Sequence, residues 1–368
     1  MYTAQDHQWM AQALQLAEQG LNTTTPNPRV GCVIVKNGVV IGKGAHLKAG
    51  EPHAEVHALR QAQDNAPDQI KGADVYVTLE PCSHHGRTPP CADALIEAGV
   101  KRVIVAMQDP NPKVSGSGLA RLQAHGIEVA SGLMEAQARE LNVGFISRMT
   151  RQLPYVRTKV AASLDGRTAL ANGASKWITG EASRLDVQHW RARSCAILTG
   201  IGTVLADDPQ MNVRALDIGR QPLRVIVDSQ LRIETSAKIL QGNALVVYAD
   251  APQIKIDILQ AAGVKLIKLA ETGGQVCLKS LLSYLAALDI NELMVEAGQT
   301  LNGALLKHKL VDELVLYHAP VLLGSQARGM FELPAFTDMK QCTSLEVKDT
   351  RQFGADFRII AKPIYSSG

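Results

Sequence analysis

Residues 78–91 read TLEPCSHHGRTPPC, and the segment PHAEVHAL at residues 52–59 comes shortly before them. The stretch ADVYVTLE before the first cysteine is apolar and β-branched, which predicts a strand. PCADALIEAGV begins with proline and ends near glycine, which predicts a short helix, and KRVIVAM predicts the next strand. Pro52 fits the first turn of a helix through HAEVHALRQAQ. This alternation indicates an α/β fold with reactive side chains at the ends of its elements.

The remainder of the first half continues the same arrangement. MYTAQDHQWMAQALQLAEQG predicts an amphipathic helix that ends near Gly20. Residues 29–46 contain two β-branched runs around Asn37-Gly38, a hairpin signal because a type I′ turn needs positive φ at both central residues. GLARLQAHGIEVASG predicts helix, turn and strand, and residues 135–152 predict one linking helix. We therefore expect an α/β sandwich built on a mixed sheet.

Four side chains in the two opening segments suit a metal-dependent hydrolysis. His53, Cys82 and Cys91 supply one imidazole and two thiolates, which suit zinc. A catalytic zinc site has three protein ligands and keeps one position for water. Glu55 can move a proton from that water to a ring nitrogen and a leaving amine. The set follows the zinc deaminase signature, H-x-E and then P-C-x-x-C, and predicts one zinc ion per chain.

The spacing of the cysteines departs from that signature. Eight residues separate Cys82 from Cys91, where the signature has two. Ligands must converge in space and not in sequence, so SHHGRTP can form a loop on the rim of the pocket while Cys91 begins a helix whose dipole favours a thiolate. Two unrelated structural cysteines near a surface histidine are the alternative, which the strand before them and the upstream His-x-Glu disfavour.

His53 and His57 also have the i, i+4 spacing of the zinc protease motif H-E-x-x-H. In that motif the glutamate directly follows the first histidine, whereas Glu55 lies one position further on. The difference turns the carboxylate by about 100° around the helix. We therefore exclude the protease interpretation and expect His57 to pack or to support the site.

Composition limits the class of protein. A chain of 368 residues is long for one core and predicts two domains, which we place at residues 1–148 and 149–368. The net charge of +3 and the absence of a Lys/Arg block argue against nucleic acid as a partner. No run of 18 apolar residues predicts a membrane span, and the N-terminus lacks the pattern of a signal peptide, so we expect a cytoplasmic protein. Six cysteines in this length do not form a disulfide framework.

The second half again alternates strands and helices. We expect strands at 155–161, 195–199, 223–228, 244–248, 292–296 and 313–319, helices near 181–192, 277–288 and 299–308, and terminal strands around RQFGADFRIIAKP. Gly200-x-Gly202 lacks the third glycine of the dinucleotide fingerprint, because Leu205 stands there. The better phosphate cradle is the strand–turn–helix around Gly298, although an ordinary turn explains it equally well.

The chain closely resembles one family. TPNPRVGCVIVKNGVVIGKGAHLKAGEPHAEVHAL and TLEPCSHHGRTPPC are similar to the deaminase part of the bifunctional riboflavin biosynthesis proteins, whose two-cysteine element has this long spacing. KVAASLDGRTA, SKWITG, LTGIGTVLADDPQMNVR and VEAGQTLNGALL resemble the reductase part. The resemblance covers essentially the whole chain. It implies an α/β fold class, with a cytidine-deaminase-like three-layer sandwich followed by a dihydrofolate-reductase-like domain.

The resemblance also implies the chemistry. The first domain would hydrolyse one ring amine of 2,5-diamino-6-ribosylamino-4(3H)-pyrimidinone 5′-phosphate with zinc and release ammonia. The second would reduce the ribosyl to the ribityl side chain with NADPH. The preference for NADPH over NADH rests on resemblance alone. A homo-oligomer is compatible with the resemblance, but no motif specifies one.

Site residues carry over by position. His53, Cys82 and Cys91 match zinc ligands and Glu55 the proton shuttle. The resemblance implies substrate contacts in the first domain at Asn27, His46 and Arg87, in the second at Lys159, Ser175, Arg191, Met211, Arg214 and Glu296, and NADPH contacts at Ala161, Trp177, Thr203, Asp207, Gly298, Gln299, Thr300, Leu301, Asn302, Gly303 and Ala304.

Several of these positions have simpler explanations. Asn27 lies between two prolines and is equally well a turn residue, and His46 and Arg87 could belong to a solvated rim. Arg191 and Arg214 suit a sugar phosphate because guanidinium forks match phosphate, with a surface salt bridge as the alternative. Lys159 and Asp207 are the candidate proton donors of the reductase.

Two other functions share part of the pattern. A nucleic-acid deaminase, such as a transfer RNA adenosine enzyme, would share the four residues of the zinc motif but would need no second domain of this kind. A non-catalytic protein stabilised by zinc would have four protein ligands, and only three are evident here.

Overall fold

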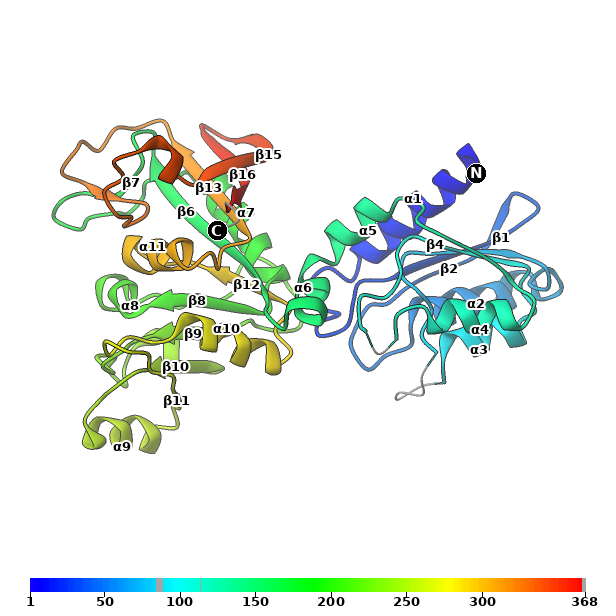
Figure 1. The fold of residues 1–368 in the computed structure, drawn as a ribbon, viewed down its shortest axis with the longest axis horizontal. Coiled ribbons are helices and arrows are strands. Elements are labelled where there is room, and N and C mark those ends of the chain that lie inside the picture. The colour runs from blue at the N-terminus through cyan, green and yellow to red at the C-terminus, as the bar shows by residue number, and fades with distance from the viewer. Residues whose placement is uncertain (84–88, 113, 366–368) are drawn as a thin grey trace. The chain divides into compact units, whose positions relative to one another are not determined.

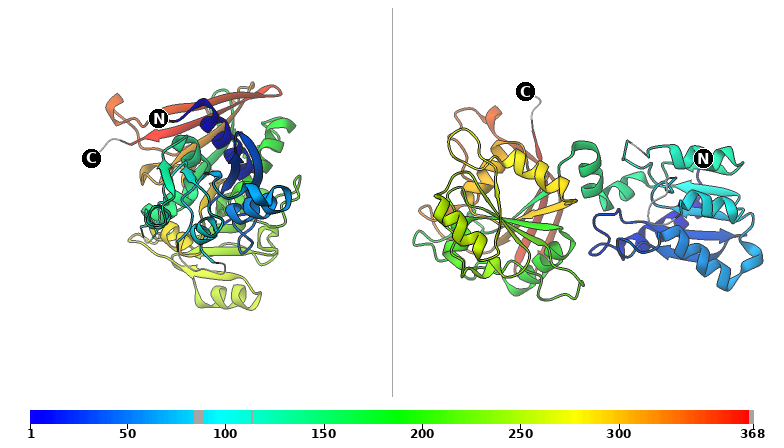
Figure 2. Two further views of the ribbon diagram at one scale, coloured as in Figure 1. Left: turned by 90° about the vertical axis from the view of Figure 1, so that its right-hand side faces the viewer. Right: turned by 90° about the horizontal axis from the view of Figure 1, so that it is seen from below.

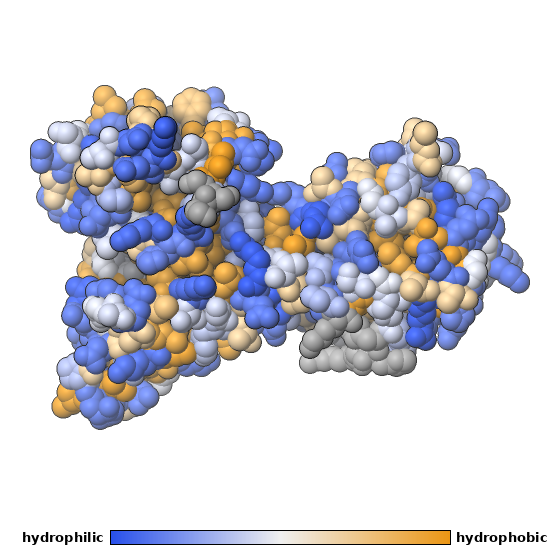
Figure 3. Space-filling view, in the orientation of Figure 1, coloured by the Kyte–Doolittle hydropathy of each residue, from blue (hydrophilic) through white to orange (hydrophobic). Residues whose placement is uncertain are grey.

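The computed structural model describes residues 1–83, 89–112 and 114–365 (Figure 1). The chain divides into two compact units, Met1–Gln152 and Leu153–Gly368, and each is described by itself. Among the described residues, no helix combines the length and the apolar character that crossing a membrane requires. On the face seen in Figure 3, hydrophilic side chains surround smaller hydrophobic areas in both units, as the ordinary globular composition leads one to expect.

The first unit is built on one mixed sheet of five strands in the order β2-β1-β3-β4-β5. The strands β1, β2 and β3 pair antiparallel, and β3, β4 and β5 pair parallel. The strands are β1 Gly31–Lys36, β2 Val39–Ala45, β3 Asp74–Val77, β4 Arg102–Val105 and β5 Glu128–Ser131. The helices are α1 Ala4–Glu18, α2 Ala54–Asn65, α3 Cys91–Glu97, α4 Ser117–Ala124, α5 Glu135–Leu141 and α6 Val143–Arg151, with a 3₁₀ turn at Pro67–Gln69. The α/β sandwich predicted from the sequence is confirmed.

Glycines allow the helices to approach this sheet closely. A Cβ added to Gly31 of β1 would lie 1.9 Å from the carbonyl oxygen of Ala13 in α1. On the opposite face, a Cβ at Gly44 of β2 would lie 2.1 Å from the carbonyl oxygen of Ala54 in α2. Successive residues of a strand point to opposite faces, so α1 and α2 form separate layers (Figure 1). The close approach at Gly44 fixes the first turn of α2, where the metal motif begins.

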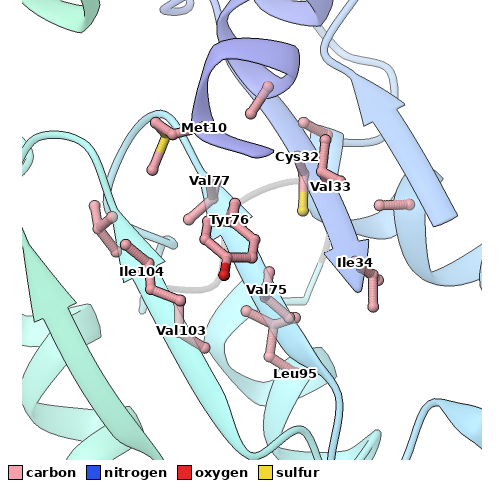
Figure 4. Packing of buried hydrophobic residues seen from close by; sticks show 14 of the residues in the cluster. Met10, Cys32, Val33, Ile34, Val75, Tyr76, Val77, Leu95, Val103 and Ile104 are labelled. Atoms are coloured by element: carbon pink, nitrogen blue, oxygen red, sulfur yellow. The ribbon is translucent and has the colours of Figure 1, made fainter. Parts of the chain in front are cut away.

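The core between these layers is apolar and close-packed. Met10 from α1 and Leu95 from α3 lie with the strand residues Val33, Val75 and Ile104, as Figure 4 shows. All five are buried. This core supports the strand ends and helix starts that carry the predicted metal ligands.

Three local predictions can be compared with the structure. The hairpin turn at Asn37-Gly38 is confirmed, with φ of 50° and 77°. Pro52 was expected in the first turn of α2, and this was wrong, because His53 is the N-cap and the helix begins at Ala54. The predicted linking helix is two helices, since the Asn142 side chain binds the backbone N–H and C=O of Arg29 and interrupts the run there.

The second unit contains a nine-stranded sheet in the order β11-β10-β9-β8-β12-β6-β13-β16-β15. Strands from β11 to β13 are parallel, and β16 and β15 add an antiparallel hairpin. The strands of this sheet are β6 Tyr155–Ser163, β8 Ala196–Gly200, β9 Leu223–Val227, β10 Ala244–Tyr248, β11 Lys265–Lys268, β12 Glu292–Val295, β13 Glu313–Ala319, β15 Ser344–Phe353 and β16 Asp356–Ile364. Short β7 Arg167–Ala169 and β14 Arg328–Gly329 pair with each other.

Helices cover both faces of this sheet. Side chains of α10 and α11 join the apolar cluster on one face, and those of α7, α8 and α9 join the cluster on the other (Figure 2). The helices are α7 Glu181–Arg193, α8 Ile201–Asp207, α9 Gln253–Ala261, α10 Leu278–Ala287 and α11 Gln299–Lys307, with 3₁₀ turns at Lys238–Leu240 and Met339–Gln341. Ligands of parallel sheets bind beyond the carboxyl ends of the strands. Here the ends of the neighbouring strands β8, β12 and β6 define that edge.

The sequence predicted the central strands and α7, α10 and α11 of this unit, but not α8, α9 or β11. The strand β11 is only partly buried, and α9 exposes Ile254 and Ile258. Peripheral elements of this kind lack a clear periodic signal, because only a part of each one faces the core.

Candidate active sites

Three metal-ligand atoms converge in the first unit. The Nδ1 atom of His53 lies 3.7 Å from the Cys82 sulfur and 3.3 Å from the Cys91 sulfur, and the three donor atoms lie within 4.8 Å of one another. His53 is the N-cap of α2, and Cys91 is the first residue of α3. The backbone N–H of Cys91 donates to the Cys82 sulfur at 3.2 Å, so the helix start also stabilises a thiolate there. The long gap between the cysteines therefore does not prevent convergence.

The pKa values of the two cysteines are shifted in opposite directions. A hydrogen bond from Cys91 lowers the pKa of Cys82 to about 4. The same hydrogen bond, together with burial, raises the pKa of Cys91. Metal binding to cysteine requires the thiolate form, and the hydrogen bond from the Cys91 backbone N–H to the Cys82 sulfur favours that form.

Glu55 lies in the first turn of α2, directly beside this cluster, and is only 3% exposed. Burial raises the pKa of Glu55 to about 7, while the charge of His53 opposes this shift. A carboxyl group with a pKa near neutrality both accepts and donates a proton readily, which suits a general acid–base group. The sequence motif thus folds into three clustered donor atoms with a buried carboxyl group next to them.

A cavity of about 480 Å³ opens onto the cluster. It is lined by the predicted residues Asn27, His46, His53, Glu55 and Cys82. The sequence interpretation missed Glu51, Glu80, Asp109, Asn111 and Phe145, which also line it. Asp109 and Asn111 belong to the segment DPNP, which follows β4 at the carboxyl edge of the sheet. Polar turn residues in that position were the signal that could have found them.

Asn27 and His46 form one polar unit on the wall of the cavity. His46 Nδ1 lies 3.1 Å from the Pro52 carbonyl oxygen, which can only accept, so this nitrogen carries the proton. Nε2 of the neutral ring then accepts from the Asn27 side-chain amide at 3.1 Å. Burial lowers the pKa of His46, which keeps the ring neutral. Arg87, the third predicted substrate contact, lies outside the described residues.

Three predicted residues of the second unit meet at the carboxyl edge of its sheet. Glu296, directly after β12, accepts from Arg191 Nε at 2.6 Å and from Arg191 Nη2 at 3.0 Å. Lys159 on β6 lies 3.9 Å from the same carboxylate. Burial alone would raise the pKa of Glu296, but the two cations lower it overall, whereas burial lowers the pKa of Lys159. The result is a largely buried carboxylate held between two cations.

The two predicted phosphate-binding arginines lie in different environments. The Arg191 guanidinium is occupied by Glu296 and by the carbonyl oxygen of Asn212, and its side chain is only 12% exposed. Arg214 is exposed and donates to the Asn212 side chain at 3.2 Å. Arg214 therefore has a guanidinium accessible to an anion, while Arg191 positions Glu296.

The other predicted positions of this unit lie around the same edge. Trp177 is 72% exposed and stacks on Arg184, so it is not a core residue. Ser175 lies in the loop before α7, Thr203 and Asp207 lie on α8, and Ala161 lies on β6. Met211 is buried in an apolar cluster.

The turn into α11 offers an open helix N-terminus. Gly298 is its N-cap and has no side chain that could cap the helix, and a Cβ at Gly298 would meet nothing within 4 Å. The fold itself therefore does not require glycine there, whereas a phosphate close to the backbone would. Thr300 is exposed, but Asn302 and Gly303 are buried, and a Cβ at Gly303 would lie 2.1 Å from the Glu332 carbonyl oxygen. Gly303 thus serves packing.

Both units match known protein families. Residues 3–107 match the cytidine and deoxycytidylate deaminase zinc-binding region, and residues 154–359 match the RibD C-terminal domain. The chain is 50% identical over 364 residues to the riboflavin biosynthesis protein RibD of Escherichia coli (strain K12), covering 96% of this chain and 98% of that protein. The chain belongs to the RibD family.

Solved structures of the family extend this result. Acinetobacter baumannii RibD, form 1, is 49% identical with a TM-score of 0.90, and the match covers 98% of this chain and 99% of that one. A Thermotoga maritima protein described as a diaminohydroxyphosphoribosylaminopyrimidine deaminase/5-amino-6-(5-phosphoribosylamino)uracil reductase is 34% identical with a TM-score of 0.86, over 98% and 99% of the two chains. As a RibD protein, the chain is a bifunctional deaminase and reductase of riboflavin biosynthesis.

Proposed function

We propose that residues 1–148 deaminate 2,5-diamino-6-ribosylamino-4(3H)-pyrimidinone 5′-phosphate and that residues 149–368 then reduce its ribosyl group with NADPH. The observation that carries the proposal is the convergence of His53, Cys82 and Cys91 beside the buried Glu55. The substrate is the one that the family resemblance implies, and the described activity of the Thermotoga maritima relative supports it.

The donor set fits zinc. One imidazole and two thiolates are soft ligands, and a set of three protein ligands is typical of catalytic zinc. Zinc held there supplies Lewis-acid activation of the attacking water. Glu55 would accept one proton of the attacking water and pass it to the ring nitrogen, and would then take the remaining hydroxyl proton and pass it to the leaving amine, so that a ring C–NH₂ and water become a carbonyl and ammonia. Asn27 and His46 orient the substrate from the cavity wall.

The second unit fits a dinucleotide and an anionic sugar. The open N-terminus of α11 suits a phosphate of NADPH, with Trp177, Thr203 and Asp207 as further contacts. NADPH held there would supply a hydride to the first carbon of the sugar in its open-chain form. Lys159 is the better-placed proton donor, because it is largely buried beside Glu296, whereas Asp207 pairs with the exposed Lys176. Arg214 is available for the sugar phosphate.

The first experiment follows ammonia release and NADPH oxidation together in the wild type and in Glu55→Gln. The wild type is expected to show both. The variant should lose ammonia release by about 10²- to 10⁴-fold, because the amide cannot transfer the proton. It should still bind zinc and oxidise NADPH with pre-deaminated substrate. A wild type that holds zinc but releases no ammonia would refute the proposed deamination.

A further inference from the structure

Glu80 is a buried carboxylate to which neither the zinc motif nor the proposed mechanism gives a role. It follows β3, lies two residues before Cys82 and is 3% exposed. Its own backbone N–H donates to the Met107 carbonyl oxygen at the end of β4. A buried carboxylate is costly unless hydrogen bonds satisfy it, so its partners indicate what it does.

All four recorded partners of the carboxylate are backbone N–H groups of one segment. Oε2 accepts from Asp109 at 3.0 Å and from Gly116 at 3.0 Å. Oε1 accepts from Gly118 at 2.8 Å and from Leu119 at 3.4 Å. A single oxygen therefore ties together the two ends of the segment from Asp109 to Gly116.

The same contacts cap α4. Its N-cap residue is Gly116, which has no side chain to accept from the first N–H groups of the helix. Glu80 supplies this acceptor from a different element, and its negative charge also suits the helix N-terminus. The two segments touch closely, since a Cβ at Gly118 would lie 2.0 Å from the Pro81 carbonyl oxygen.

The tethered segment forms part of the cavity in front of the zinc ligands. Asp109, Asn111 and Val114 all line that cavity. Cys82 has attachments of its own, because its carbonyl oxygen accepts from Ala92 and its sulfur from the Cys91 N–H. Loss of the Glu80 carboxylate would thus release the cavity wall and leave the ligand cluster in place.

We propose that Glu80 is a positioning residue of the deaminase, which holds Asp109, Asn111 and Val114 as a preformed wall for the substrate. This inference rests on the proposed deaminase function. Glu80→Gln keeps the size of the side chain but replaces one acceptor with an NH₂ group that faces backbone donors. Binding of the substrate should suffer more than its chemical conversion.

The test measures ammonia release against substrate concentration, with zinc content and thermal unfolding, in the wild type, Glu80→Gln and Asp6→Asn. Asp6 is the matched control: it is also 3% exposed and hydrogen-bonded, to Thr3, Tyr76 and Arg102, but it lies on α1 and does not line the cavity. Glu80→Gln should raise KM about ten-fold or more, with kcat within about three-fold and one zinc per chain. Asp6→Asn should lower the unfolding temperature without changing KM.

Three results would overturn the inference: an unchanged KM in Glu80→Gln, loss of zinc together with kcat, or an equal rise of KM in Asp6→Asn. If Glu80→Gln does not fold, Glu80→Asp serves instead, because the shorter carboxylate keeps the charge but cannot reach all four donors, and it must raise KM as well. A wild type without ammonia release would refute the underlying function, which this experiment distinguishes from a failure at Glu80 alone.

Discussion

The deaminase and reductase sites differ in how far their side chains lie from one another along the chain. His53 is 29 residues from Cys82 and 38 residues from Cys91, and two of these ligands begin a helix. Arg191 and Glu296 are 105 residues apart and come from different elements. The first site can therefore be recognised as a motif in the sequence, because metal-ligating residues are few and chemically distinctive. The second depends on ion pairs between common residue types, which no spacing reveals.

Removal of one sulfur should have the largest effect and should separate the two sites completely. Cys91→Ala leaves two ligands, so the chain should lose zinc and ammonia release should fall by about 10³-fold or more. NADPH oxidation with pre-deaminated substrate should stay as in the wild type, and it serves as the internal control. Metal analysis and the two rates check this prediction, and full zinc content in the variant would contradict it.

The next largest effect is expected in the second unit, where breaking the buried ion pairs of Glu296 should slow the reduction. Glu296→Gln leaves Arg191 and Lys159 without their negative partner, and separating a buried pair costs about 3–5 kcal/mol. We expect reduction to fall about 10²-fold or more, with ammonia release unchanged. Arg214→Ala is the comparison variant. Because Arg214 is exposed, this substitution is expected to raise KM and to leave kcat unchanged. Equal losses in both variants would show that the buried ion pairs of Glu296 contribute no more to reduction than the exposed Arg214 does.

A packing change in the first unit should have a moderate effect. Gly44→Ala places a Cβ 2.1 Å from the Ala54 carbonyl oxygen, which must displace the start of α2. We expect the free energy of unfolding to fall by about 1–3 kcal/mol, together with weaker zinc binding, since His53 caps the same helix. Denaturant titration and zinc competition measure the two effects. Wild-type stability would mean that the approach of helix and strand is not constrained by Gly44.

The smallest effect on stability is expected at Gly298, where the fold leaves open space. Gly298→Ala should lower stability by less than about 1 kcal/mol, because the added Cβ meets nothing. The affinity for NADPH should nevertheless fall about ten-fold if a phosphate approaches this backbone. Titration of the variant with NADPH measures this affinity. Gly202→Ala is the comparison variant, because a Cβ at Gly202 also meets nothing within 4 Å. Unchanged affinity would place the phosphate elsewhere.

Local patterns were sufficient for the elements around the zinc motif. Asn37-Gly38 predicted the hairpin, because few residues accept positive φ there. The prediction of a single linking helix was wrong for a tertiary reason. The prediction that Pro52 lies in the first turn of α2 was wrong for a local reason. Asn142 interrupts its helix to bind the backbone of Arg29, more than a hundred residues away. His53 is the N-cap of α2, so Pro52 lies one residue before the cap and outside the helix.

The amino-acid sequence alone determined the α/β class, the zinc ligand types and the presence of Glu55, because hydrophobic periodicity and rare chemical groups are local properties. Only the tertiary structure decided that Asp109 and Asn111 line the cavity, that Arg191 is occupied by Glu296 while Arg214 is exposed, and that Glu80 tethers a distant segment. These facts depend on which strand ends become neighbours and on which charges are buried. Both follow from the packing of the whole unit, and no short stretch of residues encodes them.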